Sequence, residues 1–215
     1  MKLQTLSMAA TLLATAVYFT AGGVADEPAN STLVIDDTFD RADPGKDWNP
    51  TTGEWKIVDG VLRGREIKEE KHSAATRRVV STKNAVYELN FRLTGQCRAF
   101  HFGFDPAKGE LDKKGHLFSV IVTPDFWQIL KHVDKNKREE EPNEILIRQQ
   151  TKFETNTWYK LRVTTWGNFV TAMIDGKEDL KTSHPTFGVE KPSLVFRCLG
   201  DGVEIADVRV WTQNE

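Results

Sequence analysis

The sequence predicts an all-β protein built as a two-sheet antiparallel sandwich. Short runs of alternating apolar and polar residues recur along the chain, and glycine-containing turn signals separate many of them. No run of helical length repeats with a period near 3.6 residues. The clearest alternating run is CRAFHFGFD (97–105), which has phenylalanine at every second position and is typical of a strand with one buried face.

Turn signals place three hairpins along the chain. They lie at Asp59-Gly60 within 54–65, and at Gly167-Asn168 and Asp175-Gly176 within 158–180. Such dipeptides tolerate the positive φ angles that two-residue hairpin turns require. The sequence therefore predicts pairs of neighbouring antiparallel strands at these positions.

Further strands are predicted from alternation alone. They lie within 85–93, 116–123, 126–133, 193–199 and 203–211. In the first of these, Tyr87, Leu89, Phe91 and Leu93 share one face. The charged segments 105–116 and 134–144 are predicted to be solvated connecting loops.

The N-terminus has the pattern of a secretory signal peptide. Lys2 precedes a short apolar run (8–19), and small residues stand before Asp26. We expect residues 1–25 to be a signal peptide, 26–32 a short leader and 33–215 a single domain. The chain would then be periplasmic or extracellular; an uncleaved N-terminal anchor is the alternative.

Composition narrows the partners. The chain has 29 Lys and Arg against 31 Asp and Glu, a net charge of −2 with no basic stripe, so nucleic acid is not an expected partner. No second apolar stretch approaches membrane length, so no membrane partner is expected either. We expect a monomer.

Two cysteines, Cys97 and Cys198, form neither a C-x-x-C motif nor a metal-knuckle spacing. In an exported chain they could pair and close a loop of about 100 residues, which the chain-entropy model associates with roughly 4–5 kcal/mol. Two separate buried thiols are the alternative, and the sequence leaves both open.

The segment FDRADPGKDWNPTTGEWKIVDGVLRG (39–64) resembles the opening of the 3-keto-disaccharide hydrolase domain family. Residues 85–95, 158–177 and 203–211 are similar to later strands of that family, so the resemblance spans nearly the whole predicted mature chain. It implies the concanavalin A-like lectin/glucanase fold, a curved jelly-roll sandwich. It also implies glycoside hydrolysis and an oligosaccharide or polysaccharide ligand on the concave sheet face.

Three features of this sequence depart from the patterns of these proteins. Family members commonly have an Asn-Ser-Gly stretch where this chain has GQCRAFHFGFD (95–105). Arg197 and Leu199 occupy the positions of a Gln-x-His pair. The Glu-x-Asp-x-Glu strand of glucanases with the same fold is absent. The usual polar set of the concave face is therefore altered.

Alternation also predicts which polar side chains share an outer face. If the three phenylalanines of 97–105 are buried, His101 and Asp105 point outward. If strand 85–93 pairs with this strand, its polar phase joins the same face, and Arg197 lies on the outward phase of 193–199. The predicted set is Glu88, Asn90, Arg92, His101, Asp105 and Arg197. An ordinary solvated sheet face is the alternative interpretation.

These residues and nearby loop residues make up the predicted site. The predicted catalytic groups are Glu88, Asp105 and His101, and the predicted substrate-binding residues are Glu66, His72, Asn90, Arg92, His116, Trp127 and Arg197. Trp127 or Trp166 would supply an aromatic platform for a sugar ring. No cofactor or metal is predicted; the Asp-rich segment 36–47 has oxygen ligands that suit Ca²⁺ but fits no EF-hand loop.

The predicted function is therefore that of a secreted carbohydrate-active domain similar to 3-keto-disaccharide hydrolases. A non-catalytic glycan-binding or adhesion module is one alternative. A structural or protein-interaction sandwich without a sugar site is the other.

Overall fold

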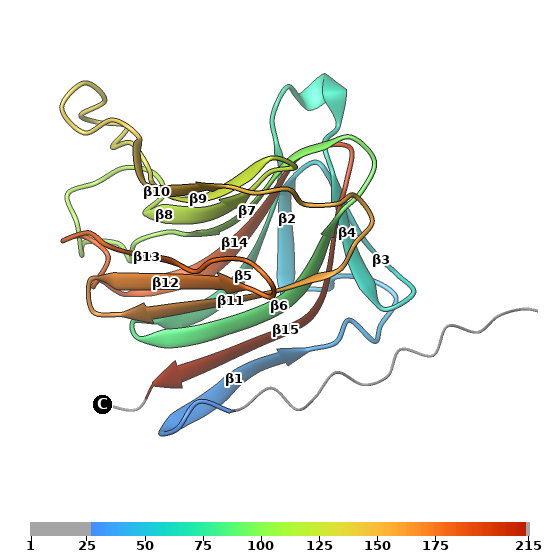
Figure 1. Ribbon diagram of the computed structural model, residues 1–215, viewed down its shortest axis with the longest axis horizontal. Helices are drawn as coiled ribbons and strands as arrows, with labels where there is room; N and C mark the ends of the chain where they lie inside the picture. The colour runs from blue at the N-terminus through green and yellow to red at the C-terminus, as the bar shows by residue number, and fades with distance from the viewer. Residues whose placement is uncertain (1–26, 214–215) are drawn as a thin grey trace, which may run out of the picture.

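The structure is a computed structural model that describes residues 27–213, which form fifteen β-strands and one short 3₁₀-helix (Figure 1). Within this range no helix is long and apolar enough to cross a membrane. The predicted signal peptide lies outside the described residues. The first strand, β1 (Ser31–Asp37), begins inside the segment predicted as a leader.

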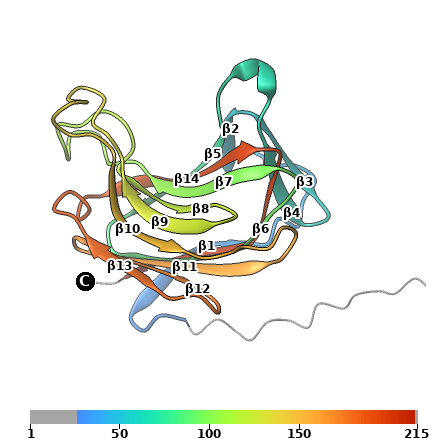
Figure 2. The ribbon, with the colours of Figure 1, turned by 45° about the horizontal axis from the view of Figure 1, so that its top comes forward.

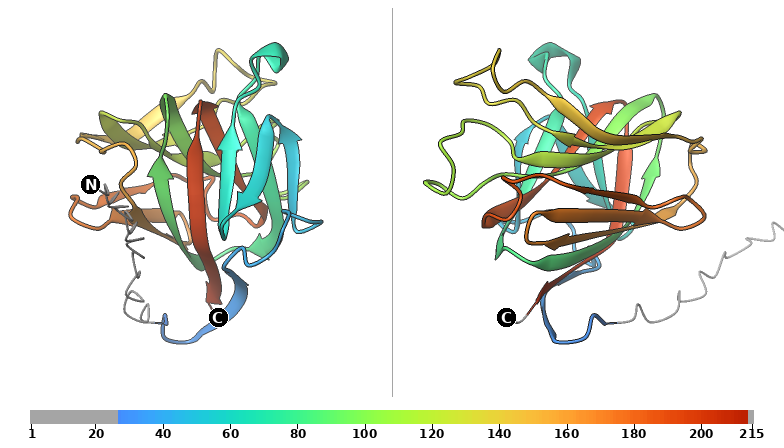
Figure 3. Two further views of the ribbon diagram at one scale, coloured as in Figure 1. Left: turned by 90° about the vertical axis from the view of Figure 1, so that its right-hand side faces the viewer. Right: turned by 60° about the vertical axis from the view of Figure 1, so that its left-hand side comes forward.

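The strands form two antiparallel sheets, which confirms the predicted class. The eight-stranded sheet has the order β13 (Leu180–Ser183), β12 (Phe169–Ile174), β11 (Tyr159–Trp166), β6 (Ala85–Leu93), β15 (Val203–Gln213), β4 (Val61–Arg65) and β3 (Glu54–Val58), with β1 paired to β15. The seven-stranded sheet has the order β10 (Glu144–Gln150), β9 (Phe126–Lys131), β8 (Phe118–Val122), β7 (Cys97–Phe104), β14 (Lys191–Gly200), β5 (Ala74–Thr82) and β2 (Trp48–Thr52). Figure 3 shows the two sheets from the sides.

The predicted hairpins are confirmed. Asp59 and Gly60 join β3 to β4 with φ angles of 53° and 71°, the positive pair that a type I′ turn requires. Gly167, with φ of 52°, joins β11 to β12, and Gly176, with φ of 72°, follows β12. Local turn chemistry therefore sets these strand pairs.

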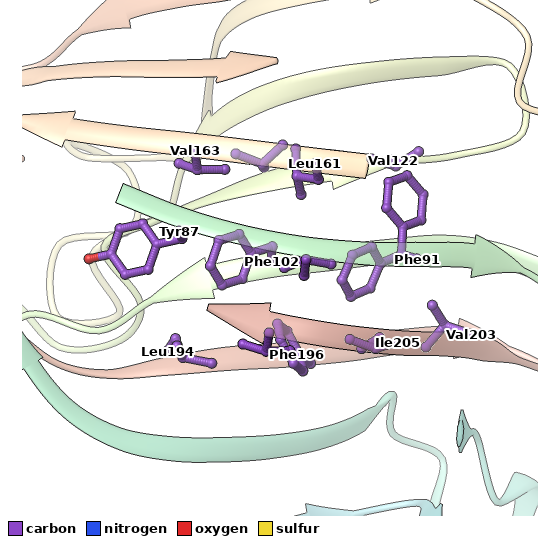
Figure 4. Close-up of a cluster of buried hydrophobic side chains, with 14 of the residues drawn as sticks. Tyr87, Phe91, Phe102, Val122, Leu161, Val163, Leu194, Phe196, Val203 and Ile205 are labelled. Atoms are coloured by element: carbon purple, nitrogen blue, oxygen red, sulfur yellow. The ribbon is translucent and has the colours of Figure 1, made fainter. Parts of the chain in front are cut away.

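The core lies between the sheets and is rich in aromatic rings. Phe100, Phe102 and Phe104 of β7 are at most 1% exposed, as their alternation predicts. Phe102 packs against Tyr87 from the other sheet and Phe196 from its own, at ring-centroid distances of 5.7 and 5.6 Å (Figure 4). These contacts fix the register of β7, because a one-residue slip would turn all three phenylalanines outward.

The predicted pairing of 85–93 with 97–105 is wrong. β6 pairs with β11 and β15, whereas β7 pairs with β8 and β14. Both strands bury their aromatic phase in the same core, but from opposite sheets, so their polar phases point to opposite outer surfaces of the sandwich. Glu88, Asn90 and Arg92 therefore lie away from His101 and Asp105.

Cys97 and Cys198 are both buried free thiols in the structure. They are neighbours: the Cys97 thiol, together with burial, raises the pKa of Cys198. Cys198 also lies within 3.8 Å of the Gly200 carbonyl oxygen. Of the two alternatives left by the sequence, the structure contains the reduced form.

Two loop regions rise on either side of the seven-stranded sheet (Figure 2). One contains the 3₁₀-helix η1 (Lys68–Glu70) and leads into β5. The other combines the predicted connecting loops 105–116 and 134–144, which are joined by a 2.9 Å hydrogen bond from the Lys135 amide to the Lys114 carbonyl. The face of the seven-stranded sheet lies between them.

We predict that Phe102→Ala destabilises the protein by about 3–5 kcal/mol, because it removes a fully buried ring and leaves a cavity. Phe169→Ala is the matched control: the same ring is 65% exposed there, and we expect a change within about 0.5 kcal/mol. Urea unfolding of both variants measures the difference. Equal losses would contradict the assigned register of β7.

Candidate functional site

A pocket of about 370 Å³ lies on the outer face of the seven-stranded sheet, between the two raised loop regions. Its lining comes from β2, β5 and β14, from the end of β7 and from both loop regions. We call it the arginine pocket, and its lining residues are Thr51, His72, Ala75, Arg77, Asp105, Gly115, His116, Lys135 and Arg197. The volume is within the range of small-molecule sites, about 300–1,000 Å³.

Asp105 is the centre of the polar contacts in the arginine pocket. Its Oδ2 accepts a hydrogen bond from Arg77 Nε at 3.1 Å, and its Oδ1 contacts His116 Nδ1. Burial acts to raise the pKa of Asp105, but the contacts with His116 and Arg77 outweigh it, and the net pKa is lowered. Asp105 is therefore a carboxylate near neutral pH.

The contacts of His116 fix its tautomer. Arg197 has only N–H donors, so its contact with His116 Nε2 requires a lone pair on that nitrogen. The proton of the neutral ring is then on Nδ1, where it is donated to Asp105. Asp105, His116 and Arg197 thus form a chain of carboxylate, neutral imidazole and guanidinium across the pocket.

A second polar pair lies beside this chain on the same face. Ser119 Oγ and His132 Nε2 are 2.7 Å apart, and the rings of His132 and His116 are 5.4 Å apart in an edge-to-face arrangement. Gly103 makes the space: a Cβ at this position would lie 2.6 Å from Ser119 Oγ. Any larger residue there would displace the Ser119–His132 pair.

His101 lies directly opposite Arg197 in the β7–β14 pairing, on the outer face as predicted. Its Nδ1 is buried and has no hydrogen-bond partner. Burial lowers the pKa of His101 to about 4, with contributions from the charge of Arg197 and from His116. Burial, with contributions led by His116 and His101, lowers the pKa of His132 to about 3. Both rings are neutral at pH 7.

The structure brings part of the predicted site together. His72, Asp105, His116 and Arg197 all line the arginine pocket, and His101 is the cross-strand neighbour of Arg197. His72 is exposed, and its Nδ1 lies 2.8 Å from the Ser73 carbonyl oxygen. Their proposed roles in binding or catalysis stay predictions.

The predicted residues of β6 are elsewhere, on the outer face of the eight-stranded sheet. Glu88 is ion-paired with Arg162 and Lys160, and Asn90 donates to Asp207 at 2.8 Å. Arg92 is ion-paired with Glu204 and stacks over Trp158. Glu88 and Asp105 therefore cannot flank one glycosidic bond, and the expectation that they share one face is wrong.

Two further expectations need correction. Trp127 is fully buried between the sheets and its Nε1 donates to Gln149, so it cannot offer a platform to a sugar. Trp166 is 55% exposed, but it belongs to the eight-stranded sheet. Glu66 lies outside the arginine pocket. It forms an ion pair with Arg98 at 2.8 Å beside η1, and both residues line a separate hollow of about 690 Å³.

Sequence reasoning missed Arg77, Lys135, Ser119 and His132. Alternation within 116–123 places Ser119 opposite its apolar neighbours, which is the one available signal for it. Arg77 and Lys135 reach the pocket only through strand pairing and loop contacts that are distant in sequence. Among the described residues, no group of three or more His, Cys, Asp or Glu side chains is arranged to hold a metal ion.

The fold, unlike the sequence, matches known proteins. No protein-family model matches the chain, and no curated protein sequence is a significant match. Among solved structures, the laminarinase from Rhodothermus marinus superposes with a TM-score of 0.65 at 14% identity, covering 86% of this chain and 98% of that one.

Two other structures are similar. A non-specific endo-β-1,3(4)-glucanase from family GH16, SCLam, has a TM-score of 0.64 at 12% identity and covers 87% of this chain and 93% of its own. The carbohydrate-binding module CBM66 from Bacillus subtilis has a TM-score of 0.53 at 14% identity and covers 78% and 92%. At these identities the likeness shows the fold alone, which is of the concanavalin A-like type.

We predict that the protein loses stability as the pH falls from about 6.5 to 4. The ordinary pKa of histidine is 6.5, and burial lowers it to about 4 in His101 and about 3 in His132, so the unfolded chain binds more protons in this window. Each ring contributes up to roughly 2 kcal/mol of lost stability at pH 5. The lowered pKa of Asp105 acts in the same direction, and because the ordinary value is 3.8 it adds to the loss at the acid end of this window, below about pH 5.

Urea unfolding at several pH values between 4 and 7 measures the slope, which is how steeply the free energy of unfolding falls with pH. His132→Gln should flatten it, whereas His72→Gln, at an exposed position, should leave it unchanged. A wild-type slope of zero would show that the two buried imidazoles are not held neutral.

Proposed function

We propose that the protein is an exported carbohydrate-binding domain that holds an oligosaccharide in the arginine pocket. The observation that carries the proposal is the pocket itself, in which hydrogen-bond donors and acceptors meet on a sheet face between two raised loop regions. Sugar hydroxyls need both kinds of partner, and this lining offers guanidinium and ammonium donors beside hydroxyl and carboxylate acceptors. The resemblance to 3-keto-disaccharide hydrolases and the likeness to carbohydrate-active structures support the same class of ligand.

Binding fits the pocket better than two-carboxylate hydrolysis does. Most glycosidases flank the scissile bond with two carboxyl groups, roughly 5–5.5 Å apart for retention and 6.5–9.5 Å for inversion. Among the described residues, the pocket lining contains one carboxylate, Asp105, and Arg77 and His116 already engage it. We therefore place the protein with non-catalytic glycan-binding modules.

Hydrolysis with His116 as a general base is the second candidate function, and one observation favours it. Asp105 orients His116 so that Nε2 carries the lone pair, which is the tautomer of a general base. That lone pair is now directed at Arg197. A substrate that draws Arg197 away would free the imidazole to accept a proton.

The proposal is tested by filling the pocket. The full-length protein is screened on a glycan array, and the affinity for each hit is measured by calorimetry. Ala75 faces the pocket opposite Arg197, so Ala75→Tyr should reduce affinity by at least about tenfold, equivalent to 1.4 kcal/mol. Product analysis on the same hits detects cleavage and would favour the second candidate.

The matched control is Ala206→Tyr. Ala206 pairs with Asn90 on the outer face of the eight-stranded sheet, so the same substitution there should leave binding intact. Thermal melting confirms that both variants fold. An array without any carbohydrate hit, or equal losses in the two variants, would show that the pocket is not a sugar site.

A further inference from the structure

The arginine pocket carries more positive than negative charge. Its lining holds three cations, Arg77, Lys135 and Arg197, against one carboxylate, Asp105. The chain as a whole has the opposite balance, with a net charge of −2. A positive hollow in an acidic protein concentrates field on an anionic ligand, because its walls exclude part of the screening solvent.

The two guanidiniums have most of their donors free. A guanidinium has five N–H donors. The structure gives Arg77 one side-chain hydrogen bond, to Asp105, and Arg197 one, to His116. Within the described residues, no carboxylate lies within ion-pair distance of Arg197 or Lys135. Several N–H groups at the pocket thus have no protein acceptor.

Arginines on the opposite outer face, unlike Arg197, are paired with carboxylates. On the eight-stranded sheet, each of five arginines has a carboxylate partner: Arg63 and Arg92 share Glu204, Arg65 pairs with Glu54, Arg162 pairs with Glu88, and Arg209 pairs with Asp36. The excess of positive charge is therefore a local property of the pocket face. The outer face of the eight-stranded sheet does not show the same excess of unpaired arginine charge.

Partial burial destabilises the charge of Arg197, which has no carboxylate partner. Burial lowers its pKa, and the repulsion from Arg77 adds to that effect, while Asp105 opposes it. The opposing Asp105 carboxylate is already engaged by Arg77 and His116. A charge that is partly removed from water is stabilised by an ion or hydrogen-bond acceptor that contacts it directly.

We propose that the oligosaccharide bound here carries an anionic group, a carboxylate or a sulfate, and that Arg77 and Arg197 bind it. This inference rests on the proposed carbohydrate function and names the chemical class of its ligand. The planar guanidinium fork matches the spacing of two oxygens on either group. Lys135 adds a third positive charge at the rim of the pocket.

The test compares each acidic oligosaccharide with a neutral counterpart that has the same sugar backbone. Calorimetry is run with tetragalacturonate and its carboxyl-reduced form, and with cellotetraose and its sulfated form. We expect at least one acidic member to bind about tenfold or more tightly than its neutral counterpart. We also expect that preference to shrink between about 50 mM and 500 mM NaCl. The pair that shows the preference identifies carboxylate or sulfate.

Variants connect the preference to the pocket. Arg197→Gln and Arg77→Gln should each remove most of the tenfold preference, and Arg77, whose side chain is 33% exposed, keeps the test usable if Arg197→Gln fails to fold. Arg209→Gln, which breaks an exposed ion pair on the other sheet, is the matched control and should keep it.

The outcomes separate the two proposals. Equal binding of neutral and acidic members overturns the anionic inference and leaves the carbohydrate function standing. A preference that Arg209→Gln reduces as much as Arg197→Gln also overturns it, because the attraction would then be general. Failure of every oligosaccharide, on the array and in calorimetry, overturns both.

Discussion

The packing of Phe100, Phe102 and Phe104 between the two sheets is the constraint on which the rest of the structure depends. Burial of each ring contributes roughly 1.5–3 kcal/mol, and all three lie on one phase of β7, so the strand has a single acceptable register. Phe196 lies opposite Phe102 in the β7–β14 pairing, which extends the constraint to the neighbouring strand. The outer face follows directly: Arg197 and His101 must be neighbours there, with Asp105 just beyond the strand end.

The same core also separates the two polar faces. β6 contributes Tyr87 and Phe91 to the core from the eight-stranded sheet, so Glu88 and Arg92 point away from the pocket. Their charges are satisfied locally by Arg162 and Glu204. Cross-strand ion pairs of this kind stabilise a sheet surface without requiring a ligand. The interpretation as an ordinary sheet face, left open by the sequence, thus fits one outer face well and the other poorly.

Local patterns predicted the class of fold and the direction of individual side chains, because alternation and turn chemistry act over a few residues. Long-range pairing is different in kind. β7 and β14 are almost a hundred residues apart, and nothing in either segment identifies the other as its partner, so the sequence alone does not reveal that His101 lies opposite Arg197. Trp127 shows a related limit, since an aromatic residue on a strand suits a core and a sugar platform equally well until the sheets are placed.

Asp105 explains why the positive charge of the arginine pocket is only partly neutralised. One carboxylate orients His116 and accepts from Arg77, which leaves it unable to neutralise Arg197 as well. His101 cannot assist, because its ring is neutral and its buried Nδ1 has no partner. The arginines of the eight-stranded sheet find carboxylate partners within the chain, and a site that departs from this pattern without an evident structural gain is where function is expected. An anionic ligand would supply the acceptors that the folded chain does not, and would relieve the repulsion between Arg77 and Arg197 that the free protein tolerates.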